Sequence, residues 1–135
     1  MAGFSNYLED ELLDHVFGGA DYTRPGTLYI SLHTADPGET GASEATGSGY
    51  ARKDVTNNAT NFPASSSGAK ANGTAVTFAA ATGNWSSSAN MTHFGIWDAV
   101  TSGNFLGGGA LAVAKPVLNG DTPSFAIGDI DITLD

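Results

Sequence analysis

Three histidines, His15, His33 and His93, are the side chains of this sequence most suited to binding a metal ion or moving a proton. No two of them have the close helical spacing of a zinc-binding motif. The chain contains no cysteine, so no thiolate can complete a zinc site. We interpret the histidines as polar-face or interface residues, while a metal site assembled by the fold from distant positions stays open as an alternative.

Carboxylates that could offer oxygen ligands to calcium form two groups: Asp36, Glu39 and Glu44, and Asp129, Asp131 and Asp135. Neither group has the offsets of the twelve-residue EF-hand loop. The chain has 14 acidic residues among 135, so such groups arise by chance. We therefore predict that the protein binds no metal ion and no other cofactor.

Motifs for covalent or phosphate chemistry are missing from the sequence. There is no G-x-S-x-G motif, and the Ser-rich stretches at 65–67 and 86–88 have no base beside them. The run Gly107–Gly109 lacks the lysine and helix of a phosphate-binding loop, and we interpret it as a bulge or a close backbone approach within a strand. A carboxylate pair for glycoside hydrolysis stays open, although only Trp85 and Trp97 suggest a sugar cleft. The sequence favours a protein that is not an enzyme.

The charge balance bears on the choice of partner. Fourteen acidic and five basic residues give a net charge of -9, and the basic residues form no cluster in the sequence. Binding to nucleic acid is therefore not expected, because it depends on neutralising phosphates with Lys and Arg. The N-terminal region is acidic and its apolar run is interrupted by charges, so we expect no export signal and no membrane span.

The clearest element is a strand at residues 27–34. Leu28, Ile30 and Leu32 alternate with polar or aromatic residues, which is the pattern of a half-buried strand. An acidic, glycine-rich loop follows at 35–49. A loop of this length is usually functional or disordered.

One helix is predicted at about 5–17. Leu8, Leu12 and Val16 fall on one stripe, and Ser5 or Asn6 is a suitable N-cap. We expect this helix to pack over one end of a sheet, the alternative being a helix reserved for a partner.

Further short strands are predicted near 50–55, 74–80, 92–98, 105–115, 124–127 and 130–135, with a surface excursion at 56–73 that could extend along a neighbouring subunit. The predicted fold is a single domain over 1–135, mostly β: an antiparallel β-sandwich or jelly-roll-like barrel from about 27 to 135, with one N-terminal α-helix.

Four strings spread over the chain carry a family resemblance: LYISLHTADPGETG, GYAR, HFGIWDAVTSGNFLGGGAL and NGDTPSFAIGDIDITLD. They resemble a family of small tailed-phage virion proteins, some labelled tail-fibre proteins and others similar to head decoration or cement proteins. The resemblance spans nearly the whole chain and implies assembly rather than catalysis.

Our first hypothesis is a capsid cement or decoration protein on the outer head surface. Its partners would be the major capsid protein and itself, as a homotrimer, because capsid lattices have local threefold positions. The chain is short and has neither an internal repeat nor heptads, unlike a typical fibre. Contacts with the capsid or between subunits are predicted at Asp36, Glu39, Glu44, Tyr50, Arg52 and Phe62.

The alternative hypothesis is a tail-tip or tail-fibre module that binds the host surface. In that case Trp85, His93 and Trp97 would stack on a receptor carbohydrate.

Overall fold

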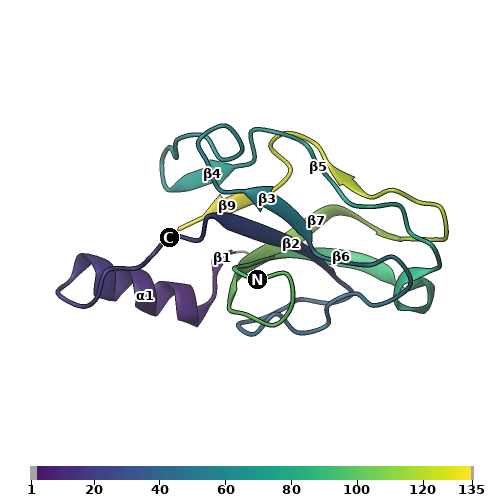
Figure 1. Cartoon of the computed structure of the whole chain (residues 1–135), viewed down its shortest axis with the longest axis horizontal. Coiled ribbons are helices and arrows are strands. Elements are labelled where there is room, and N and C mark those ends of the chain that lie inside the picture. Colours follow the sequence, from purple (N-terminus) through teal and green to yellow (C-terminus); the bar gives the residue numbers. More distant parts are fainter. Residues whose placement is uncertain (1–2, 135) are drawn as a thin grey trace.

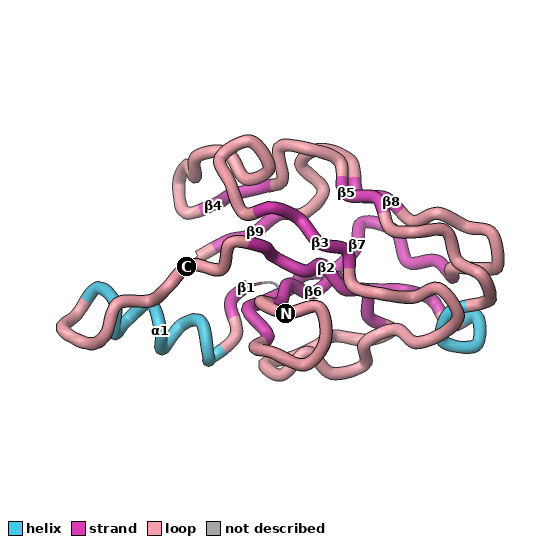
Figure 2. Tube along the Cα trace, viewed as in Figure 1, coloured by secondary structure: helices cyan, strands magenta, loops and turns pink. Residues whose placement is uncertain are grey.

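The computed structural model describes residues 3–134, which form one α-helix, one short 3-10 helix and nine strands; Figures 1 and 2 show their arrangement. A short 3-10 helix, η1, spans Trp85–Ser88. The other elements, in chain order, are β1 (Gly3–Phe4), α1 (Asn6–Val16), β2 (Thr27–His33), β3 (Lys53–Thr56), β4 (Ala69–Ala71), β5 (Val76–Thr77), β6 (Asn90–Trp97), β7 (Phe105–Pro116), β8 (Ser124–Phe125) and β9 (Asp131–Thr133). Among these residues, no helix has the length and apolar character needed to cross a membrane.

A five-stranded antiparallel sheet with the order β1-β7-β6-β2-β3 is the centre of the fold. Two ribbons, β4-β9 and β5-β8, provide the remaining pairings. Phe125 of β8 lies edge-on to Phe94 of β6, with 5.9 Å between ring centroids, so this ribbon closes the core over one face of the sheet. The predicted class, mostly β with one N-terminal helix, is confirmed.

Both faces of β2 are buried, whereas its alternation predicts a half-buried strand. Ile30 and Leu32 point into the hydrophobic core with Phe94 and Ile96 of the neighbouring strand. Ser31 and His33 point to the opposite face, yet neither side chain is exposed to solvent. The difference arises because the 35–49 loop folds back over this second face.

The N-terminal helix begins as predicted but does not pack as predicted. The Ser5 hydroxyl accepts a hydrogen bond from the Leu8 amide, which is the expected N-cap. No helix residue is buried, and Figure 1 shows α1 extending away from the sheet. Only its first turn touches the core, through Tyr7 and Leu8. The expectation of a helix packed over one end of the sheet is therefore wrong for most of its length.

The 56–73 segment is part of this chain's own fold and does not extend away from it. Phe62 lies in the core, and β4 pairs with β9. Asn72 is buried: its side-chain amide donates to the carbonyls of Thr74 and Ala126, and its side-chain oxygen accepts from the Ile130 amide. A polar side chain satisfied in this way fixes the segment against the C-terminal strands.

The strands differ in extent from those predicted. β1 and β4 were not predicted, and β5 and β8 have two residues each, fewer than their patterns indicate. The glycine run in β7 was predicted to mark a bulge or a close backbone approach. A Cβ added at Gly107 would collide with the Gly3 carbonyl oxygen of β1, so the close approach is confirmed.

We predict that Asn72→Ala lowers the free energy of unfolding by about 2–3 kcal/mol, because it leaves buried backbone groups without partners. Urea unfolding followed by tryptophan fluorescence measures this loss. The matched control is Asn90→Ala, at an exposed asparagine, which should change stability by less than about 0.5 kcal/mol. Equal effects of the two substitutions would contradict the role assigned to Asn72.

Candidate functional site

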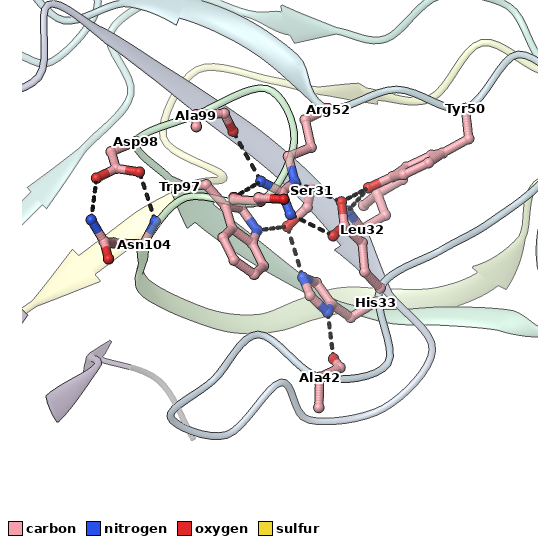
Figure 3. A network of polar contacts seen from close by, with 12 residues as sticks. Ser31, Leu32, His33, Ala42, Tyr50, Arg52, Trp97, Asp98, Ala99 and Asn104 are labelled. Carbon is pink, nitrogen blue, oxygen red and sulfur yellow. Dashed lines mark hydrogen bonds and ion pairs between the residues drawn. The ribbon is translucent and has the colours of Figure 1, made fainter. Parts of the chain in front are cut away.

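The guanidinium of Arg52 is the centre of a polar network that joins two loops to the sheet (Figure 3). Its Nε and Nη2 donate to the two carboxylate oxygens of Glu44, both at 2.8 Å. Its Nη1 donates to the carbonyl oxygens of Ala99 and Ser102, at 2.9 and 2.8 Å. The Arg52 side chain is 7% exposed, so the two-pronged pair with Glu44 forms largely away from water.

An indole ring lies beneath the same guanidinium. The central carbon of the Arg52 guanidinium is 3.6 Å from the centroid of the Trp97 ring. Such stacking of a cation on an aromatic face is favourable, particularly where water is excluded. Trp97 in turn packs edge-on against Phe105, with 5.1 Å between centroids. One arginine therefore contacts the 35–49 loop, the 98–104 loop and β6 at once.

A second chain of hydrogen bonds runs from Trp97 to the 35–49 loop. The indole N–H of Trp97 donates to Ser31 Oγ at 2.9 Å, and Ser31 Oγ lies 2.7 Å from His33 Nε2. His33 Nδ1 lies 2.7 Å from the Ala42 carbonyl oxygen. A carbonyl only accepts, so Nδ1 carries the proton and Nε2 accepts from the Ser31 hydroxyl. With a neutral His33 ring, the Trp97 N–H, the Ser31 hydroxyl, both ring nitrogens of His33 and the Ala42 carbonyl all have hydrogen-bond partners.

Glycines make room for these contacts. A Cβ at Gly95 would lie 2.5 Å from Ser31 Oγ and 2.6 Å from His33 Nε2. A Cβ at Gly41 would collide with the Trp97 ring, and Gly41 has a φ of +74°. The loop therefore closes on Trp97 only with glycine at this position, which both fits the space and adopts the left-handed backbone.

The electrostatics agree with a closed, internal network. Burial by itself would raise the pKa of Glu44, but hydrogen bonds from Arg52 and Tyr50 outweigh it and the pKa is lowered. Burial, followed by the charge of Glu44, raises the pKa of Tyr50, which donates to Glu44 Oε1 at 2.8 Å. Burial lowers the pKa of His33. The ionised pair and the neutral histidine are thus the favoured forms.

The Ser31–His33 pair lacks the geometry of a catalytic nucleophile and base. Ser31 and His33 are hydrogen-bonded like a nucleophile and its base, but both are fully buried and Nδ1 faces a carbonyl in place of a carboxylate. Among the described residues, no group of three His, Asp or Glu side chains lies close enough together to hold a metal ion. The network is built to hold loops in place.

The predicted partner-contact residues fall into two sets. Glu44, Tyr50 and Arg52 are brought together, but inside the network, with their polar atoms directed at one another. Phe62 is a core residue and offers no surface for a partner. These four side chains already have structural roles in this chain, and a partner contact at the partly exposed Glu44 and Tyr50 stays a prediction.

The other two predicted contact residues lie on the outer side of the 35–49 loop. Asp36 is exposed and accepts a hydrogen bond from the Gly38 amide. Glu39 is partly exposed and its carboxylate accepts from the Asn6 amide at 2.8 Å, at the positive end of the helix dipole. A partner contact at Asp36 and Glu39 stays a prediction.

The aromatic residues proposed for receptor binding do not form a surface. Trp85 is completely buried among Tyr50 and Phe78, and Trp97 is covered by Arg52 and the 35–49 loop. Only His93 is partly exposed. Carbohydrate stacking on these two indole rings is therefore not possible in this fold.

The apolar side chains at the C-terminal end of the helix are exposed, which the favoured expectation of a helix packed over the sheet does not include. Leu13, Val16 and Phe17 are 57%, 64% and 77% exposed. The apolar stripe of the helix is visible in the sequence, but the stripe alone does not say whether it meets this chain's sheet or another surface. The pairing of Arg52 with Glu44 has no sequence signal beyond their opposite charges.

We predict that Arg52→Met lowers the free energy of unfolding by about 2–4 kcal/mol, because it leaves the Glu44 carboxylate partly buried without its cation. Lys53→Met is the matched control: Lys53 forms an exposed pair with Asp54 at 3.2 Å, which should contribute less than about 1 kcal/mol. Denaturant unfolding of both variants makes the comparison. A loss for Arg52→Met no larger than that for Lys53→Met would refute the central position of Arg52.

We also predict that stability declines as the pH falls below about 6.5, the usual pKa of an unfolded histidine. The pKa of His33 is lower in the folded state, so protons bind the unfolded chain more readily in this range. The loss from this one group is at most about 1.4 kcal/mol per pH unit. Unfolding curves at several pH values above about 5 separate it from carboxylate titration.

The direct check on this pH effect is the tautomer of His33. Nitrogen-15 spectra should show Nδ1 protonated and Nε2 unprotonated at neutral pH. His15→Gln, at an exposed histidine, should leave the pH dependence in place. A His33 ring that titrates at or above its usual pKa would contradict the assignment.

Comparison with known proteins identifies the family of this chain. No curated protein is similar enough to the chain to count as a match. A sequence model of the family described as Podophage GP4 fiber I protein gp80 matches residues 3–133. Because this match covers nearly the whole chain, the protein belongs to the podophage GP4 fiber I protein gp80 family, whose members are small structural proteins of tailed-phage virions.

Proposed function

We propose that this virion structural protein is an assembly module of a phage fibre, joined to neighbouring chains in the virion through α1. The name of the matching family supports the fibre assignment. The observation that carries the assembly role is the exposed apolar end of the helix, formed by Leu13, Val16 and Phe17. Clustered exposed apolar side chains on a folded domain are typical of protein interaction sites.

The loops and the 56–73 segment are fixed to the body of the fold, and this contrast with the projecting helix supports a binding role for the helix. The 35–49 and 98–104 loops are held to the sheet by Arg52, and the 56–73 segment is held by Asn72. The helix meets the core only through Tyr7 and Leu8, near the Ser5 cap, and its last turn is joined to the segment that follows it by the hydrogen bond from the Tyr22 amide to His15. A rigid domain with one projecting element suits a protein that connects others. We propose no catalytic activity for it.

The second candidate is a capsid cement protein on the outer head surface, bound to the major capsid protein as a homotrimer. The observation that favours it is the compact fold of 135 residues without an internal repeat, which suits an accessory present in many copies. Its net charge of -9 is compatible with a position outside the shell, away from packaged DNA. In this case Asp36 and Glu39 on the outer loop face would remain candidate contacts.

The two candidates predict different locations in the particle. Purified virions would be separated into heads and tails with attached fibres, and the copies of this protein counted by quantitative mass spectrometry against the major capsid protein. We expect it in the tail and fibre fraction, in far fewer copies than the major capsid protein. Copies in the head fraction comparable in number with the major capsid protein would overturn the fibre proposal and favour the cement role.

A further inference from the structure

An apolar pocket of about 190 Å³ lies at the base of α1. Its apolar walls include Phe4, Leu28, Ile96, Leu106 and Ile132. Leu8, in the first turn of the helix, also lines it. A cavity of about 150 Å³ lined by such residues is enough to hold a benzene ring. The pocket therefore has the size and chemistry to receive one aromatic side chain.

We propose that this pocket receives the exposed end of α1 from a second copy of the chain, with Phe17 as the inserted side chain. Phe17 is 77% exposed at the C-cap of the helix. It cannot fill the pocket of its own chain, because it follows Leu8 by nine residues, or about 14 Å along the helix axis. Figure 1 shows the helix directed away from the sheet that forms the pocket.

Charge complementarity favours a second copy as the occupant. Arg24 and Lys70 line the pocket together with one carboxylate, Asp131. The helix that would enter carries Glu9, Asp10, Glu11 and Asp14, all exposed or partly exposed. The chain has only five basic residues, and Arg52 is enclosed by its own partners. Of the other four basic residues, Arg24 and Lys70 therefore lie where an acidic helix would approach.

This contact joins two different surfaces of the chain, the helix end and the pocket. Each copy then offers one of each, so the association forms a reciprocal pair, a ring if the rotation between copies closes, or an open filament if it does not. Burial of Leu13, Val16 and Phe17 supplies the favourable term, while opposed charges at the rim set the orientation. The proposal goes beyond the placement in the virion, since the same contact could form on a head or on a tail.

The absence of cysteine from the sequence allows a clean cross-linking test. Val16→Cys and Ile132→Cys, made as separate proteins and mixed, place one thiol on the helix and one in the pocket. A short bis-maleimide should join them into a mixed dimer. The matched control pairs Val16→Cys with Val113→Cys, at an exposed valine on β7. Cross-linking of the control pair as efficient as that of the pocket pair would overturn the proposal.

Sedimentation velocity over a range of concentrations gives the strength of the association. Phe17→Ser should weaken it about tenfold or more, because a buried aromatic anchor commonly dominates such a contact. Val100→Ser, at an exposed apolar residue outside the helix, should leave it unchanged. Wild-type protein that stays monomeric at every concentration, or association insensitive to Phe17→Ser, would overturn the proposal. Neither result depends on where the protein lies in the particle.

Discussion

The guanidinium of Arg52 holds the separate parts of this chain together. It donates to the carboxylate of Glu44 in one loop and to the carbonyls of Ala99 and Ser102 in another, and it lies over the ring of Trp97 in the sheet. A charge with so little exposure to water is tolerated only when its hydrogen bonds are satisfied. Any change that releases one partner therefore disturbs the others, and the two loops are fixed together.

This constraint determines which surface is left for assembly. The Arg52 network and the His33 chain hold the Glu44 carboxylate and the Ala42 carbonyl of the 35–49 loop against the sheet, while Asp36 and Glu39 lie on the outer side of this loop. Trp85 and Trp97 are used in the same way, as internal packing. The apolar end of α1 has no such partner within the described residues. The exposed apolar end of the helix is therefore the surface that we propose for assembly, whereas the two indole rings are buried.

The sequence predicts those parts of the structure that depend on local pattern. The alternation in β2, the Ser5 cap and stripe of α1, and the close approach at Gly107 follow from residue types within a few positions of one another. The family resemblance also follows from strings that can be read directly. What lies beyond local pattern is the pairing of Arg52 with the 98–104 loop, nearly fifty residues away. Burial of Ser31 and His33 also cannot be predicted from the sequence, because the alternation of a strand does not show that a loop covers its polar face.

The most direct test of this account is amide hydrogen exchange on the isolated protein and on the same protein in assembled particles. In the isolated protein, the amides of Ala42 and Ala45 should be protected like strand amides, because they donate to the carbonyls of Pro37 in the same loop and of Leu32 in β2. The second half of α1 should exchange faster there and become protected on assembly. Rapid exchange at Ala42 and Ala45, or helix protection that is the same in both states, would contradict a fixed loop and an assembling helix.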